Sequence, residues 1–123
     1  MTSCFHLYKK ISDFRDLDLI CKNQYLAFTM AELKTKIKAA ELLLYSAVAA
    51  HDAGNYTIDD AMAKLYCTDL AMEVTTQAVQ MMGGNGFMKE YHVERMMRDA
   101  KITQIYEGTN EIQKLIISGP IFR

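Results

Sequence analysis

Residues 57–84 read TIDDAMAKLYCTDLAMEVTTQAVQMMGG, and this stretch decides the fold class. Large side chains recur in it every three to four residues, at Met62, Tyr66, Leu70, Val74, Gln77 and Met81. That spacing places them on one face of an α-helix. Thr57 stands at the N-cap position, with Asp60 in the place of the usual Glu of a capping box. The pair Gly83-Gly84 marks the end. The pattern predicts one helix of more than five turns.

A second long helix is predicted just before it, from about Asn23 to Ala53. Its apolar positions show the same spacing: Tyr25, Phe28, Leu33, Ile37, Ala40, Leu44 and Ala47. Gly54 followed by Asn55 is typical of a helix C-terminus. Two long helices with a short connector are expected to pack antiparallel. Each needs a partner for its apolar face to be stable.

The remaining third of the chain is divided into shorter pieces. We expect a turn at 85–91, a short helix from about His92 to Ala100, and a non-periodic stretch at 101–108. A last helix begins at Gly108 or Thr109 and ends before Gly119-Pro120. Together the elements predict an all-α, antiparallel four-helix bundle with two long helices and shorter C-terminal helices.

The first 21 residues show neither a helical nor an alternating period, so residues 1–21 are left unassigned and 22–123 are predicted to form one bundle domain. A chain of this length can bury a single core. Its net charge of −1 shows no basic stripe for nucleic acid. No apolar run reaches the length that spans a bilayer.

Three cysteines and three histidines show no metal-ligand spacing, and we predict no metal site. The odd number of cysteines favours reduced thiols, as in intracellular proteins. The expected compartment is bacterial cytoplasm or the mitochondrial matrix. The composition does not distinguish between these two.

Two glycine-containing corners could carry chemistry. The first, residues 80–87, reads QMMGGNGF, where three glycines in four positions would let a ligand approach the backbone. Gly83 is equally well explained as a helix C-cap. The second is Glu107 directly before Gly108 at a predicted helix start. Glu107 could be a base aimed at a substrate for which the glycine leaves room, or a carboxylate that neutralises the helix N-terminus. The local pattern leaves both alternatives open.

The order of several motifs resembles one family. QMMGGNGF (80–87), ERMMRDAKI (94–102) and QIYEGTNEIQ (104–113) closely resemble the C-terminal signature of the acyl-CoA dehydrogenases. MAELKTKIKAAELLLY (30–45) resembles a helix of the same family. The resemblance runs from about Asn23 to the C-terminus. It implies a flavoenzyme of fatty-acid β-oxidation that removes an α-proton and a β-hydride from an acyl-CoA thioester.

The resemblance also implies roles for individual residues. Glu107 would be the α-proton base, with Tyr106 beside the acyl chain and Gly108 leaving room for the substrate. FAD would be contacted by residues from both corners: Gln80, Gly83, Gly84, Thr109 and Glu111. In the family the glycine corner contacts the FAD of a neighbouring subunit, so the resemblance implies a homo-oligomer, a dimer or a tetramer. Its electron acceptor would be electron-transfer flavoprotein.

The family's enzymes are longer, with an N-terminal helical domain and a middle β-domain that enclose the flavin ring and the CoA. The family's Arg-x-x-Phe-Gly element has no convincing counterpart in residues 1–21. We therefore expect this chain on its own to be incomplete for catalysis and to bind no flavin. The alternative function is a non-catalytic oligomerisation bundle derived from the family.

Overall fold

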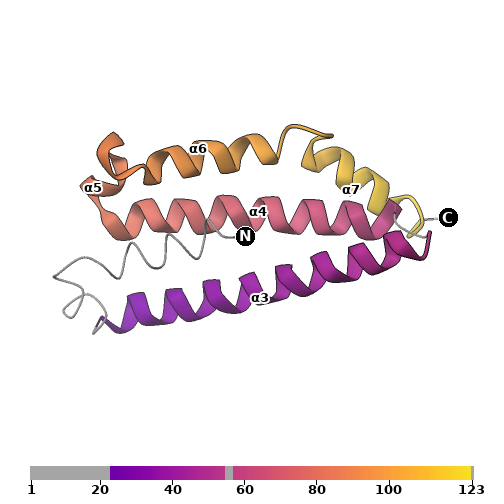
Figure 1. Ribbon diagram of the computed structural model, residues 1–123, viewed down its shortest axis with the longest axis horizontal. Coiled ribbons are helices and arrows are strands. Elements are labelled where there is room, and N and C mark those ends of the chain that lie inside the picture. The colour runs from indigo at the N-terminus through magenta and orange to yellow at the C-terminus, as the bar shows by residue number, and fades with distance from the viewer. Residues whose placement is uncertain (1–22, 55–56, 123) are drawn as a thin grey trace. The chain divides into compact units, whose positions relative to one another are not determined.

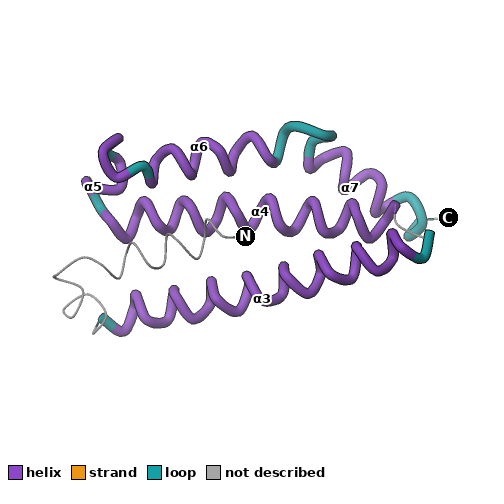
Figure 2. The backbone as a smooth tube through the Cα atoms, in the orientation of Figure 1, coloured by secondary structure: helices purple, strands orange, loops and turns teal. Residues whose placement is uncertain are grey.

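The computed structural model describes residues 23–54 and 57–122 (Figure 1). In chain order the elements are α3 (Gln24–Asp52), α4 (Thr57–Met82), α5 (Gly84–Phe87), the 3-10 helix η1 (Lys89–Tyr91), α6 (Val93–Thr103) and α7 (Asn110–Ser118). The described residues contain helices, turns and loops and no strand, as Figure 2 shows. The predicted all-α class is confirmed. The predicted unassigned segment, 1–21, lies outside the described residues.

The chain separates into two compact units, Met1–Lys34 and Thr35–Arg123, with the boundary inside α3. In the first unit, Asn23 caps the start of α3. Its Oδ1 accepts hydrogen bonds from the backbone N–H groups of Tyr25 (3.0 Å) and Leu26 (3.4 Å). These bonds satisfy two of the donors that a helix start leaves unpaired. The helix therefore begins within a residue of its predicted start.

In the second unit, α4 runs antiparallel to the part of α3 that follows Lys34. Near one end, Lys36 Nζ lies 2.6 Å from Glu73 Oε1. Near the other, His51 Nδ1 lies 3.5 Å from Asp60 Oδ2. Residue numbers rise along α3 as they fall along α4, which confirms the predicted antiparallel pair.

Helix α4 lies between this part of α3 and the α6–α7 segment (Figure 1). Because it is covered on two sides, its buried residues extend beyond the predicted stripe, to Ala61, Ala63, Thr75 and Ala78. Leu70 and Val74 are buried as predicted, whereas Tyr66 remains 39% exposed. Half of its buried residues are alanine, so the neighbouring helices can pack closely against it with little apolar area buried. The single-face prediction for this helix was therefore too narrow.

The helix ends differ from prediction in detail. Helix α4 begins at Thr57 itself, with Asp59 and Asp60 in its first turn. The predicted turn at 85–91 contains α5 and η1. Helix α6 continues to Thr103, three residues past its predicted end, and the Thr103 hydroxyl donates to the Ala100 carbonyl at 2.7 Å. No helix among the described residues is long and apolar enough to cross a membrane.

Candidate functional site

The loop between α6 and α7 has an unusual backbone. Glu107 and Gly108 are both in the left-handed region, with φ of 53° and 88°. For a residue with a side chain this conformation costs about 1–2 kcal/mol. At Gly108 a Cβ atom would lie 3.0 Å from Gln113 Nε2, so a larger residue would also be crowded. The surrounding structure must hold these two residues in place.

Two helices hold the Gly108 carbonyl. Lys64 of α4 donates to it through Nζ at 2.7 Å, and Gln113 of α7 donates through Nε2 at 3.2 Å. At the far side of the loop, the backbone N–H of Asn110 donates to the carbonyl of Gln104 at 3.0 Å. The loop is thus fixed at its middle and closed at its base.

Asn110 ties the start of α7 to α4. It is 4% exposed, and its Oδ1 accepts from Lys64 Nζ at 2.9 Å. Its Nδ2 donates to Thr68 Oγ1 at 2.9 Å and to Asp69 Oδ1 at 2.7 Å. Gln104 donates to the same Asp69 oxygen. A buried amide with all its groups paired in this way specifies one arrangement of the loop.

The loop presents Glu107 outward. Its side chain is exposed. Among the described residues no hydrogen bond is made by its backbone N–H. Tyr106, directly before it, is 52% exposed. Within the described chain, one residue of a fixed loop therefore offers both an N–H donor without a partner and an exposed carboxylate, and the following glycine adds no side chain.

Thr109 and Glu111 lie at the start of α7, beside this loop. Hydrogen bonds from the backbone N–H of Glu111 and from the Thr109 hydroxyl lower the pKa of the Glu111 carboxyl, with smaller help from Lys114 and Lys101. These four residues line a small hollow of about 140 Å³. A negatively charged Glu111 in the first turn stabilises α7, because the N-terminus of a helix carries partial positive charge.

The glycine corner lies at the other end of α6. Gly83 has φ of 57° and donates its N–H to the Gln80 carbonyl at 3.1 Å. Gly84 would meet no atom within 4 Å if it carried a Cβ. At Gly86 the same Cβ would lie 2.5 Å from the Val79 carbonyl oxygen. Packing therefore explains Gly86 and backbone conformation explains Gly83, whereas nothing within the described chain requires glycine at position 84.

The predicted site residues thus form two groups rather than one. Tyr106, Glu107, Gly108, Thr109 and Glu111 share the α6–α7 corner, while Gln80, Gly83 and Gly84 share the α4–α5 corner. Helix α6 has 11 residues, a length of about 16 Å, between the two corners. The groups would contact different parts of a large ligand, or different ligands.

Sequence reasoning did not single out Lys64, Asn110 or Gly86. Lys64 looks like a solvated charge between apolar positions, and Asn110 like an ordinary helix-start residue. Their roles depend on contacts between residues more than 40 positions apart in the chain. Gly86 belongs to the predicted corner, but its close approach to α4 is a tertiary feature.

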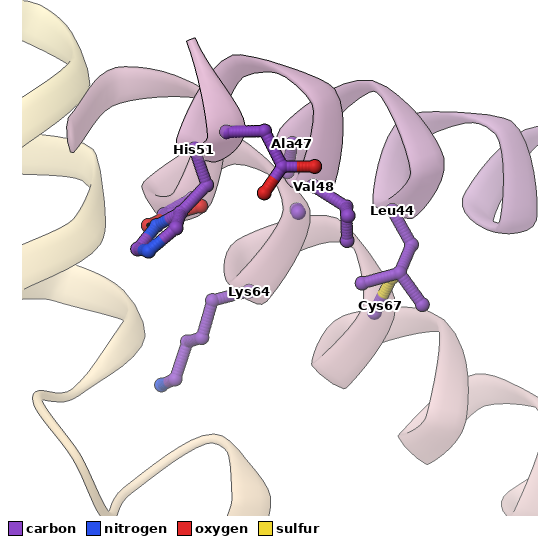
Figure 3. A pocket seen from close by; sticks show the side chains of 9 residues that line it. Leu44, Ala47, Val48, His51, Lys64 and Cys67 are labelled. Carbon is purple, nitrogen blue, oxygen red and sulfur yellow. Dashed lines mark ion pairs between the residues drawn. The ribbon is translucent and has the colours of Figure 1, made fainter. Parts of the chain in front are cut away.

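A second, larger hollow of about 450 Å³ lies between α3 and α4 (Figure 3). Its lining is mostly apolar and includes Leu44, Val48 and Cys67. Burial raises the pKa of the Cys67 thiol, so it is not an activated nucleophile. In Figure 3 the Lys64 side chain extends away from these apolar residues. This hollow lacks the residues of either corner and is not the candidate site.

The fold and the α6–α7 corner define a helical-bundle domain in which a fixed loop carries an exposed carboxylate and, within the described chain, a backbone N–H without a partner. A family model described as "Acyl-CoA dehydrogenase, C-terminal domain" matches residues 4–121. The chain belongs to this family. The matched range begins inside residues 1–21, which the structure does not describe.

Individual relatives agree with this assignment. The chain is 56% identical over 110 residues to a short-chain-specific acyl-CoA dehydrogenase of Clostridium acetobutylicum, covering 89% of this chain and 28% of that protein. The butyryl-CoA dehydrogenase structure from Megasphaera elsdenii is 50% identical with a TM-score of 0.81, covering 84% of this chain and 27% of that one. The chain therefore spans little more than a quarter of the length of these relatives.

An acyl-CoA dehydrogenase structure from Geobacillus kaustophilus is also similar. It is 31% identical with a TM-score of 0.85, and the match covers 96% of this chain and 32% of that one. The same helical domain is thus present at quite different sequence identities.

Proposed function

We propose that this chain supplies the catalytic base of an FAD-dependent acyl-CoA dehydrogenase, and that the base is Glu107. The observation that carries the proposal is the α6–α7 corner. There an exposed carboxylate and a backbone N–H that has no partner among residues 23–54 and 57–122 belong to the same residue, which is held in a left-handed conformation. Strain of this kind in a well-fixed loop is typical of functional sites.

The corner suits removal of an α-proton from a thioester. The α-proton of an acyl-CoA is weakly acidic, and a carboxylate removes it effectively only when the carbonyl oxygen is stabilised as negative charge develops. The N–H of Glu107 is available to donate to that oxygen. The carboxylate of the same residue then accepts the α-proton. Gly108 leaves space for the thioester, and Tyr106 would flank the acyl chain.

The cofactor of this reaction would be FAD, which accepts the β-hydrogen as hydride when it is bound. A role for Gly84 in holding FAD is supported by its exposure and by the open space at the position that a Cβ would occupy. Gln80 and Gly83 lie beside it in the glycine corner. Thr109 and Glu111 would contact another part of FAD from the α7 start. Because α6, about 16 Å long, lies between the two corners, they would contact different parts of one FAD or two FAD molecules of an oligomer.

The proposed partners follow from the same reaction. The substrate is an acyl-CoA, and the reduced flavin would be reoxidised by electron-transfer flavoprotein. A homo-oligomer, a dimer or a tetramer, would bring a glycine corner to each neighbouring active site. Exposed apolar side chains on α3, among them Leu42, Tyr45 and Val48, would be covered in such an assembly. The proposed compartment is bacterial cytoplasm or the mitochondrial matrix.

The test is a domain graft. Residues 23–121 would replace the corresponding segment of the Clostridium acetobutylicum enzyme, and butyryl-CoA would be added to the purified flavoprotein. We expect bleaching of the oxidised flavin absorbance and turnover with an artificial electron acceptor. Glu107→Gln should bind FAD equally well and lose at least about a thousandfold in turnover.

Two results would contradict the proposal. A folded, yellow graft whose turnover survives Glu107→Gln would show that Glu107 is not the base. A graft that assembles correctly but never bleaches would favour the alternative, a bundle that serves oligomerisation alone. The matched control is Glu90→Gln in η1, an exposed carboxylate outside both corners, which should leave turnover unchanged.

A further inference from the structure

The hydrogen-bond partners of Lys64 are unusual for a lysine, because both are neutral oxygens. Lys64 is half-buried on α4, and its ammonium donates to the Gly108 carbonyl and to Asn110 Oδ1. The ion pairs found among the described residues do not include it. A partly buried ammonium commonly has a carboxylate partner. The Lys64 ammonium instead donates to two neutral oxygens, the carbonyl of Gly108 in the loop and the side-chain oxygen of Asn110 at the start of α7.

The position of those oxygens matters. The Gly108 carbonyl follows directly after Glu107, so the bond from Lys64 fixes the plane of the Gly108–Thr109 peptide. Two residues after Gly108, the Asn110 side chain donates to Thr68 and Asp69 and so fixes the start of α7. Both contacts run to α4, a 26-residue helix packed on two sides. The position of the loop is therefore set by its hydrogen bonds to α4.

The charge of Lys64 adds a second argument. A cation at a helix N-terminus is electrostatically unfavourable, and α7 begins at Asn110 beside the ammonium. For the fold alone, a neutral donor would be preferable at this place. A positive charge beside the loop would instead favour the negative charge that develops on the thioester oxygen at the Glu107 N–H in the proposed reaction.

We propose that Lys64 and Asn110 are positioning residues for the base: they hold the Glu107–Gly108 backbone so that the N–H and the carboxylate of Glu107 face one thioester. This inference rests on the proposed function. It adds a specific clamp from α4 that acts through the loop and does not touch the substrate.

The first test uses the 123-residue chain without cofactor. Lys64→Met keeps the apolar stem but removes the donors, and Lys36→Met on α3 is the matched control, a lysine that does not contact the loop. Hydrogen exchange followed by NMR would report the Asn110 amide, which is bonded to Gln104. We expect Lys64→Met to raise its exchange rate at least tenfold, with amides in the middle of α4 unchanged. Equal changes in both variants, or none in the loop, would overturn the clamp.

The second test uses the graft. Lys64→Met should lower kcat on the order of tenfold to a hundredfold with little change in KM or FAD content, as expected for misplacement of a base. Its kcat–pH profile should shift relative to the parent graft. Lys64→Arg, which keeps the charge and the donors, should recover most of the lost turnover. Should Lys64→Met not fold, Asn110→Ser replaces it in both experiments, with the same expected directions.

The outcomes separate the two proposals. An inactive parent graft counts against the proposed function, while the exchange data still decide whether Lys64 holds the loop. An active graft in which Lys64→Met releases the loop yet leaves kcat and its pH profile unchanged overturns the positioning role and leaves Glu107 as the base.

Discussion

Two glycines in the same short helix should respond to alanine in opposite ways. At Gly86 an added Cβ would lie 2.5 Å from the Val79 carbonyl oxygen and 2.9 Å from the Val79 Cα, whereas ordinary contacts begin at 3.4 Å. The obstacle is backbone of α4, which cannot rotate away. Helix α5 would therefore have to move outward by about 0.9 Å, and overpacking of this kind costs about 1–3 kcal/mol. At Gly84 the Cβ meets nothing within 4 Å, and φ is not in the left-handed region.

The magnitudes follow from the length of the chain. An entropy of unfolding of about 2.1 cal/mol/K per residue gives about 4 °C in Tm for each kcal/mol in a 123-residue chain. Gly86→Ala is thus expected to lower Tm by about 8 °C for a loss near 2 kcal/mol. Gly84→Ala should raise the free energy of unfolding by about 0.5 kcal/mol, because alanine restricts the unfolded chain and favours helix.

Thermal and urea unfolding of the two variants, followed by far-UV circular dichroism, would measure the difference. Equal midpoints for Gly84→Ala and Gly86→Ala would refute the packing argument. In the graft, Gly84→Ala has a second use. If the absence of a side chain at Gly84 lets FAD contact the backbone there, Gly84→Ala should be as stable as the parent graft and yet bind FAD less tightly. A glycine needed only for the fold would not show this combination.

Three further predictions concern single side chains. Gly108→Ala should lower the free energy of unfolding by about 1–2 kcal/mol in urea titrations, because of its positive φ and the contact with Gln113. The fold lowers the pKa of the Glu111 carboxyl, so its contribution to stability is present above the unfolded pKa and is lost as pH falls through the folded pKa. Glu111→Gln should therefore make the free energy of unfolding, measured by urea titration, less dependent on pH in that acidic range. Burial raises the pKa of the Cys67 thiol, so alkylation at neutral pH should be slower in the native chain than in urea, as peptide mass spectrometry would show.

The sequence alone determined much of the helical framework. Apolar spacing and glycine stops placed both long helices to within a residue or two, because periodicity and capping are local properties. It was less successful at the end of α6, where Lys101 bonds to Gln104 and Thr103 to Ala100 after the apolar pattern has stopped. It also misjudged α4, since a one-face pattern does not show that a helix is covered on two sides.

The candidate base was visible in the sequence, but its surroundings were not. Motif order identified Glu107, while its local pattern fitted a helix-start carboxylate equally well. The tertiary structure decided that Glu107 and Gly108 share a left-handed turn and that the Glu107 N–H is left without a partner in the described chain. It also showed that Lys64 of α4 holds this turn, through the Gly108 carbonyl and through Asn110 at the start of α7. Such contacts join residues more than 40 positions apart, and only the packing of α7 against α4 brings them within hydrogen-bond distance.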